Sequence, residues 1–298
     1  MYIEQYKDIV SHCEARNKTL ARYFLNHEID LGDQTEAEIL QQMERNLEVM
    51  EQAVALGLEG VKSFSGLTGG DAKRMHEYMT KVSPLGDSRY FEAAQNAVAI
   101  NEVNASMGII CATPTAGSSG IVPGVLIAFR DRLGLSRRAQ IDFLITSGGS
   151  GIVIGNHASL SGAAGGCQAE VGSASAMAAA ALVEAAGGTP SESGHALAIA
   201  LKNLLGLTCD PVATLVEVPC IKRNAIGAVN AIVAAEMALA GVKSRIPVDE
   251  VILAMGSIGR MMPVALRETA LGGLAQTPTA RKIDRLLKEQ GTVDESDL

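Results

Sequence analysis

Three cysteines lie in short segments rich in Gly or Pro, which is where loops commonly present ligands. They are Cys167 in GGCQAE, Cys209 in GLTCDPV and Cys220 in VPCIKRN. Flanking glycines let the backbone approach a bulky inorganic group, and a proline beside a cysteine fixes the local turn. Cys220 is followed by two cations and by the expected start of a helix near Asn224, and both features favour thiolate over thiol.

Thiolates are soft ligands that suit iron–sulfur clusters or zinc. The segments that carry the three cysteines contain no CxxC pair, so a zinc ribbon or finger is disfavoured. Three thiolates on a four-iron cluster leave one iron free to act as a Lewis acid on a substrate. From spacing alone, three unrelated buried cysteines explain the pattern equally well. Cys13, expected on an amphipathic helix, and Cys111, beside a polar loop, need no metal.

The loop CATPTAGSSG at 111–120 combines hydroxyls, glycines and exposed amides, which suit a small anion such as a carboxylate. The candidate carboxylate contacts are Thr113, Thr115, Gly117, Ser118, Ser119 and, further along the chain, Arg223. No Gly-Lys-Ser/Thr follows, so a nucleotide phosphate is not favoured. The loop SFSGLTGGD at 63–71 has a similar character. Ordinary turn chemistry is the alternative explanation for both loops.

Composition excludes several classes of protein for this chain of 298 residues. A net charge of −8 and a pI near 5.2 argue against nucleic acid or an anionic membrane surface as the partner. The uncharged stretch 143–169 is interrupted by SGGSG, Asn156-His157 and a Gly pair, so we expect no membrane span. The first residues lack the basic and apolar regions of a secretory signal, and five cysteines form no disulfide framework. We therefore expect a cytoplasmic protein.

The elements that position these residues are predicted to be helices. Residues 1–60 are rich in charged side chains, and a capping box at Thr35 and Glu38 begins the clearest amphipathic helix. Its apolar residues at 40, 43, 47, 50 and 54 share one face, which favours a stripe directed at the core over a surface for a partner.

The middle of the chain alternates Ala-rich helices with Gly/Ser/Thr-rich loops. Helices are expected over 174–186, from a second capping box at Thr189 through 204, over 224–240, and from 247 to about 255. Segments 144–146 and 151–154 fit either short strands or buried helix. Small side chains let such helices approach closely. We predict an all-α fold with a polar end, 289–298, that frays.

Six motifs carry a family resemblance: SGLTGGDA (65–72), CATPTAGSSGIVPG (111–124), ASLSGAAGGCQAEVGSASAMAAA (158–180), GLTCDPV (206–212), VPCIKRNA (218–225) and RETALGGLA (267–275). Together they resemble the alpha chain of the iron–sulfur-dependent L-serine dehydratases, over about residues 60 to 275. The resemblance implies a helical lead-in at 1–60, an iron–sulfur catalytic domain at 61–280 and a polar C-terminal tail at 281–298. It also implies a lyase that deaminates L-serine to pyruvate and ammonia, with an oxygen-sensitive 4Fe–4S cluster held by Cys167, Cys209 and Cys220.

Two departures from the family pattern bear on partners. Some members are one longer chain with an extra N-terminal domain, whereas here only the lead-in precedes the first motif. The resemblance therefore implies a split form with a separate beta chain, for which residues 1–60 offer a docking face. Some single-chain members also end in a cysteine that reaches the cluster, but this chain ends in Glu-Ser-Asp-Leu.

Dehydration of serine requires removal of a weakly acidic α-hydrogen and departure of hydroxide, a poor leaving group. An open iron that binds the hydroxyl assists this departure, whereas no lysine lies in a recognisable pyridoxal phosphate motif. His157, in GNHAS, is the candidate general base, and a beta chain is an equally good source of one.

Two other functions remain open from the sequence. One is a non-enzymatic iron–sulfur sensor or electron-transfer protein, although such proteins usually enclose their cluster with four protein ligands. The other is a related lyase that acts on another β-substituted amino acid, such as cysteine or threonine.

Overall fold

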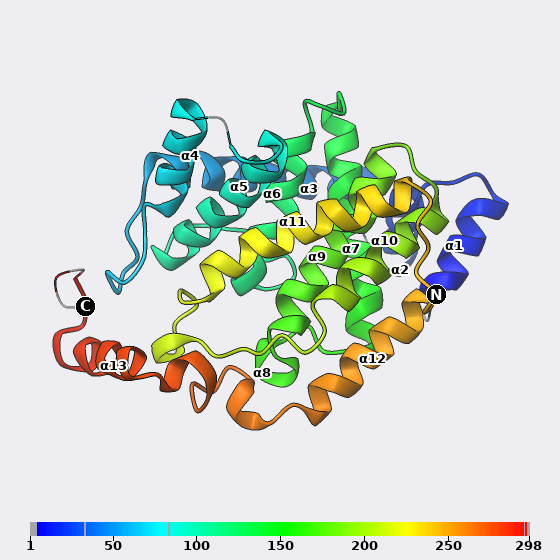
Figure 1. Ribbon diagram of the computed structural model, residues 1–298. Coiled ribbons are helices and arrows are strands. Elements are labelled where there is room, and N and C mark those ends of the chain that lie inside the picture. Colours follow the sequence, from blue (N-terminus) through cyan, green and yellow to red (C-terminus); the bar gives the residue numbers. More distant parts are fainter. Residues whose placement is uncertain (1–4, 33, 83, 295, 297–298) are drawn as a thin grey trace.

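A computed structural model describes residues 5–32, 34–82, 84–294 and 296, and Figure 1 shows its helical architecture. The prediction of an all-α fold is confirmed, since this part of the chain contains no strand beyond two isolated bridges. The helices are α1 Tyr6–Ala15, α2 Leu20–Leu31, α3 Glu36–Glu59, α4 Asp71–Lys81, α5 Ser88–Ala105, α6 Ile121–Phe129, α7 Arg137–His157, α8 Gly162–Gly165, α9 Ser173–Ala185, α10 Pro190–Asn203, α11 Cys220–Leu239, α12 Val248–Met261 and α13 Pro278–Gln290.

Helix α9 forms the centre of the core (Figure 1). Its residues Ser173–Val183 are all buried, because α6, α7, α10 and α11 pack around it. A helix that is apolar on every side has to be enclosed in this way. The Ala-rich sequence also keeps α9 thin, so the surrounding helices come close to it.

Helices α5 and α6 show how closely small residues let two backbones approach. A methyl group on Gly120 would lie 2.1 Å from the carbonyl oxygen of Ala97, and one on Gly124 would lie 2.9 Å from that of Ala93. No side chain fits at such distances, so the crossing requires glycine on α6. The expectation of close helix approach is therefore confirmed at this crossing.

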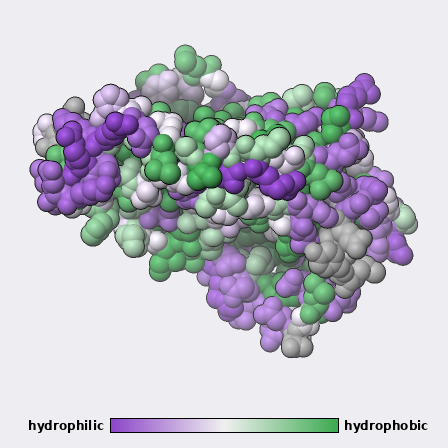
Figure 2. Space-filling view, turned by 90° about the horizontal axis from the view of Figure 1, so that it is seen from below, coloured by the Kyte–Doolittle hydropathy of each residue, from purple (hydrophilic) through white to green (hydrophobic). Residues whose placement is uncertain are grey.

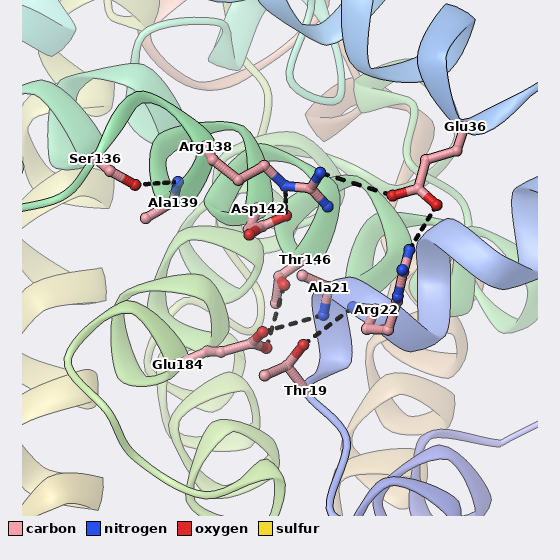
Figure 3. Close-up of polar contacts among 10 residues, drawn as sticks. All are labelled: Thr19, Ala21, Arg22, Glu36, Ser136, Arg138, Ala139, Asp142, Thr146 and Glu184. Carbon is pink, nitrogen blue, oxygen red and sulfur yellow. Dashed lines mark hydrogen bonds and ion pairs between the residues drawn. The ribbon is translucent and has the colours of Figure 1, made fainter.

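Residues 1–60 are part of the main core. The predicted stripe on α3 faces inward, with Leu47 and Met50 buried in the cluster that also holds Tyr6 of α1 and the α9 alanines. The half-buried Glu184 of α9 accepts hydrogen bonds from the first two backbone N–H groups of α2, at Leu20 and at Ala21, and Figure 3 shows the bond from Ala21. A carboxylate at a helix N-terminus is favourable there, so the core itself fixes α2.

Both predicted capping boxes are present, at Thr35 with Glu38 and at Thr189 with Glu192. The segments that also fit strands, 144–146 and 151–154, belong to the continuous helix α7. Helix α12 continues to Met261, beyond the expected end near 255. No described helix is both long and apolar enough to cross a membrane.

The prediction that the chain frays from residue 289 is wrong for residues 289–294. Helix α13 continues to Gln290, and Val293 behind it is buried. The backbone N–H of Val293 donates to the carbonyl of Ser65 at 2.8 Å, so this segment is held against the 63–71 loop. Residues 295, 297 and 298 of the predicted tail lie outside the described part.

We expect Gly120→Ala to lower the free energy of unfolding by about 1–3 kcal/mol, because the new methyl group has to push α5 and α6 apart. Gly148→Ala is the matched control, since Gly148 is an exposed helical position of α7 with nothing near its would-be methyl group. That variant should be unchanged or up to about 1 kcal/mol more stable. Denaturant unfolding followed by circular dichroism measures both, and equal stability of the two would contradict the close-crossing argument.

Candidate active site

The three predicted cysteines come together in the fold. Cys167 follows α8 and precedes a π-helical turn at Gln168–Gly172, Cys209 lies in the loop after α10, and Cys220 is the first residue of α11. All three are buried. The sulfurs of Cys167 and Cys209 lie within 4.8 Å of each other and of a carboxylate oxygen of Glu170. We call Cys167, Cys209 and Cys220 the thiol group.

Glycine is needed for this convergence at Gly166, which has a φ of +75°. A methyl group there would lie 2.9 Å from the carbonyl oxygen of Leu207 and closer still to Met262. The backbone N–H of Gln168 donates to that same carbonyl at 3.0 Å. The segments around Cys167 and Cys209 are thus in direct backbone contact.

The three cysteines of the thiol group differ in the direction in which their pKa values are shifted. A hydrogen bond from the Cys209 thiol, followed by the charge and hydrogen bond of Arg223, lowers the pKa of Cys167 against the opposing effect of burial. The same hydrogen bond raises the pKa of Cys209, and burial adds to the effect. Burial and the nearby Cys167 charge raise the pKa of Cys220. The prediction that its helix terminus and cations favour a Cys220 thiolate is therefore wrong for the chain alone, because burial outweighs them.

Arg223 contacts parts of all three cysteine segments. Its Nη1 donates to Cys167 Sγ at 3.4 Å and to the carbonyl of Thr208 at 2.6 Å, and its Nη2 donates to Asp210 at 2.8 Å. The Arg223 and Asp210 side chains are only 14% and 6% exposed. Sequence reasoning placed Arg223 among the carboxylate contacts of a substrate, and the structure shows it bound to the protein's own groups.

The segment 262–274 forms a further wall beside Cys209. The backbone of Cys209 donates to Leu266 at 2.9 Å and accepts from Glu268 at 2.6 Å. Asp210 accepts from the backbone of Leu274 at 2.8 Å. Glu268 adopts a left-handed backbone with φ of 57°, a strained conformation that these neighbours hold in place.

The 111–120 loop lies against the same site and is fixed from α11. The buried Asn224 donates to the carbonyl of Gly117 at 2.8 Å and accepts from the backbone of Gly120 at 3.2 Å. Within the loop, Ser118 bonds to Thr113 and Thr115, and Ser118 and Ser119 are fully buried. The hydroxyls of the predicted carboxylate contacts therefore shape the loop itself.

Glu170 links this loop to the thiol group, and sequence reasoning missed it. Burial raises the pKa of Glu170, a hydrogen bond from Thr115 lowers it, and the charge of Glu268 raises it further. Gly117 leaves space for this carboxylate, since a methyl group there would lie 3.4 Å from Glu170 Oε1. The signal was present in the sequence, because Glu170 follows Cys167 by one helical turn within GGCQAEVG.

The 63–71 loop is attached to the Cys220 segment by a second missed carboxylate. The hydroxyls of Ser65 and Thr68 donate to Glu217 at 2.8 and 2.6 Å. Glu217 is buried and precedes Cys220 by three residues. Both predicted polar loops, 63–71 and 111–120, thus reach the segments that carry the thiol group.

The remaining candidates lie further out. His157 ends α7, where a loop was expected, and its backbone lies beside Gly256 of α12. One turn further along α12, a methyl group on Gly259 would lie 3.1 Å from the Cα of Gly165, so α12 runs beside both His157 and the segment that precedes Cys167. Cys13 is buried in the core, and Cys111 bonds to the carbonyl of Asn46 and lines a separate cavity of about 440 Å³.

The residues present fit a metal or iron–sulfur group. The sulfurs of Cys167 and Cys209 lie with the Glu170 carboxylate, the buried Cys220 is close enough to interact electrostatically with both cysteines, and Arg223 hydrogen-bonds to one sulfur, so the donors are soft and one of them is oriented by a neighbour. The raised pKa values keep the Cys209 and Cys220 thiols neutral in the chain alone, and these thiols become thiolate ligands when a metal replaces their protons. The helical fold and this buried thiol group together define a candidate metal-dependent enzyme site.

The sequence model of the serine dehydratase alpha chain matches residues 8–275. The chain belongs to this family. It is 56% identical over 279 residues to a probable L-serine dehydratase alpha chain from Bacillus subtilis, covering 94% of this chain and 93% of that one. It is also 44% identical to the L-serine dehydratase alpha chain of Peptoniphilus asaccharolyticus, covering 96% and 98% of the two chains. A longer L-serine dehydratase from Helicobacter pylori is 36% identical, covering 91% of this chain and 61% of the relative.

We expect Asp210→Ala to destabilise the protein by about 3–5 kcal/mol, because it leaves the buried Arg223 without its carboxylate. The variant also removes the acceptor for the Leu274 backbone. Asp284→Ala breaks the exposed pair with Lys288 on α13 and is the control, with an expected change of about 0.5 kcal/mol or less. Denaturant unfolding compares the two, and similar losses would show that the Arg223 pair does not hold the site together.

Proposed function

We propose that this protein is the catalytic alpha chain of an L-serine dehydratase that contains a 4Fe–4S cluster. L-Serine loses the α-proton and the β-hydroxyl as water, and the resulting aminoacrylate tautomerises and hydrolyses to pyruvate and ammonia. The observation that carries the proposal is the close grouping of the buried Cys167 and Cys209 with Glu170, in a chain of this family, with the buried Cys220 near enough for its charge to act on Cys209.

The three cysteines are the proposed ligands, and they leave one iron of a four-iron cluster without a protein thiolate. When bound, such an iron supplies a Lewis acid for the substrate hydroxyl. Arg223 donates to the sulfur of Cys167, which stabilises its thiolate form and orients it. The burial of the thiol group keeps bulk water from the reacting centre.

The other proposed roles belong to residues around this group. We propose that the 111–120 loop holds the serine carboxylate through its backbone N–H groups, since the Thr115 hydroxyl donates to Glu170. His157, near the Cys167 segment, is the proposed source of the general base, and a partner chain is the other source. Arg223 contributes by its charge rather than as a direct contact to the substrate, since its guanidinium donates to Cys167, Thr208 and Asp210.

Replacement of Cys167, Cys209 or Cys220 by Ser should abolish both the cluster and the activity, because each residue is a ligand. The expected loss of pyruvate formation exceeds about 100-fold, because removal of a residue that only hydrogen-bonds to a metal ligand already costs about 10- to 100-fold. Iron and sulfide content, visible absorption and a pyruvate assay after anaerobic reconstitution are the measurements. Cys111→Ser is the control and should keep the cluster, since Cys111 lines a separate cavity. A full cluster in any of the three ligand variants removes that residue from the set.

We further propose that the chain works with a separate beta chain. Two relatives named alpha chain match it nearly end to end, whereas a Helicobacter pylori relative is longer. In the described part of residues 1–60 the apolar stripe packs on the core, and the outer side is mainly charged, with Leu31 and Leu56 as exposed apolar residues. A more apolar surface lies over the segment that joins α12 to α13, with exposed Met261, Val264, Leu271 and Leu274 (Figure 2).

This apolar segment is the outer face of the wall that contacts Cys209, so we place the beta chain there. An interface of ordinary size buries about 1,600 Å² and is enough to order such a segment over a substrate. The same contact also gives a partner residue a route to the site.

We expect the isolated, cluster-loaded chain to turn over L-serine poorly and a co-purified beta chain to restore the rate. Val264→Asp should weaken co-purification by about tenfold or more, because it places a charge in an apolar interface. Leu85→Asp, at an exposed leucine between α4 and α5, is the control and should bind normally. Full turnover by the isolated chain, unchanged when the beta chain is added, would disprove the partner proposal.

A further inference from the structure

Two carboxylates from distant parts of the sequence meet over Gly162, at the edge of the thiol group. A methyl group on Gly162 would lie 2.5 Å from Glu170 Oε2 and 3.1 Å from Glu268 Oε2. Because Glu170 Oε2 and Glu268 Oε2 both lie close to this one point, the two oxygens are also close to each other. A single ammonium nitrogen that donates to two carboxylate oxygens lies about 2.8 Å from each, so it can bridge a separation of that size.

The surroundings of this pair are negatively charged. Glu170 lies within 4.8 Å of the sulfurs of Cys167 and Cys209, and the charge of Glu268 acts on both Glu170 and Cys220. The cation at the thiol group, Arg223, is already paired with Asp210. Within the described part of the chain, the neighbours that shift the pKa of Glu170 are Thr115 and Glu268, and neither of them is a cation.

A partly buried pair of ionised carboxylates is costly unless one of them takes up a proton, which the raised pKa of Glu170 favours, or a bound ligand supplies a positive charge in place of that proton. The place of the pair also matters, because it lies between the thiol group and the 111–120 loop. A ligand that is held by its ammonium group at Glu170 and Glu268 has its neighbouring carbon atoms directed at either the sulfurs or the loop.

We propose that Glu170 and Glu268 bind the α-ammonium group of the substrate and so make the site selective for amino acids. This inference rests on the proposed function, since it assigns a subsite within that active site. The ammonium group occupies the space over Gly162, the substrate carboxylate lies toward the 111–120 loop, and the β-hydroxyl lies toward the thiol group. Any side chain at position 162 would fill the space that the ammonium group needs.

The pair is held firmly enough to act as a rigid receptor. Glu170 is on the π-helical turn that follows Cys167, and Thr115 donates to it from the loop. Glu268 is fixed by its backbone hydrogen bond to Cys209 at 2.6 Å, in spite of its left-handed conformation. Both carboxylates are thus positioned by the same segments that position the cysteine ligands.

The test compares L-serine with 3-hydroxypropanoate, which keeps the carboxylate and the β-hydroxyl but lacks the amino group. Binding is followed through the change that each compound causes in the visible absorption of the anaerobically reconstituted, cluster-containing protein. Wild-type protein should bind L-serine more tightly than 3-hydroxypropanoate. Glu170→Gln and Glu268→Gln should each weaken L-serine binding by about 10- to 100-fold and leave 3-hydroxypropanoate binding nearly unchanged.

Four further observations decide the outcome. Glu289→Gln, at an exposed position of α13, is the control and should bind both compounds as the wild type does. If Glu170→Gln alters cluster content or the spectrum before any compound is added, Glu170 is a cluster ligand and its assignment here is wrong. Glu268→Gln then tests the ammonium subsite separately, and unchanged selectivity in that variant overturns it. If wild-type protein with a full cluster responds to neither compound, the proposed function itself fails.

Discussion

The guanidinium of Arg223 is the contact on which the site depends, because it joins the three segments that carry the cysteines. It belongs to the first turn of α11, three residues after Cys220, and it reaches both Asp210, next to Cys209, and the sulfur of Cys167. These segments are far apart in the sequence, and no continuous element holds them together. One buried charged group with several donors in a fixed plane supplies that connection, as lysine could not.

The Ala-rich core makes this arrangement possible from the inside. Helix α9 begins directly after the π-helical turn that carries Glu170, and α11 packs against α9 while it presents Cys220, Arg223 and Asn224 from its first turns. Because small side chains let α9 and α11 lie close together, the groups at their N-terminal ends share one small volume. A core of large side chains would separate these helix ends and with them the thiol group.

Much of the fold could be predicted from the sequence, since its signals are local. The capping boxes at Thr35 and Thr189 and the apolar stripe after Thr35 specify helices through neighbouring residues alone. The cysteine segments stood out for the same reason, by their Gly and Pro neighbours. The expectation that Cys220 precedes its helix was wrong by a few residues, because Pro219 is the N-cap of α11 and Cys220 its first residue. The expectation that His157 lies in a loop was wrong because the glycines of α7 do not break a buried helix.

The groups that the sequence did not predict owe their roles to tertiary contacts. Glu170 and Glu268 meet over a glycine, and neither carries a local pattern that announces the other. Glu217 and Asp210 look like ordinary surface acids until the fold buries them against Ser65, Thr68 and Arg223. Burial is what makes the hydrogen bonds and ion pairs of these acids important. Whether a single polar residue is buried cannot be predicted from its neighbours in the sequence.

The site has two walls of different construction, and this difference limits how a second protein can act on it. One wall consists of α9, which the core encloses, and the first turns of α11, whose inner side packs against α9. The other consists of the 262–274 segment and the 63–71 loop, which are held by hydrogen bonds with Asp210 and Glu217 and with the backbones of Cys209 and Val293. The first wall cannot move without repacking the core, whereas the second needs only a few hydrogen bonds to rearrange. A partner that tunes substrate binding therefore has to act through the second wall, whose segments also carry Glu268 and adjoin the Cys209 and Cys220 ligands.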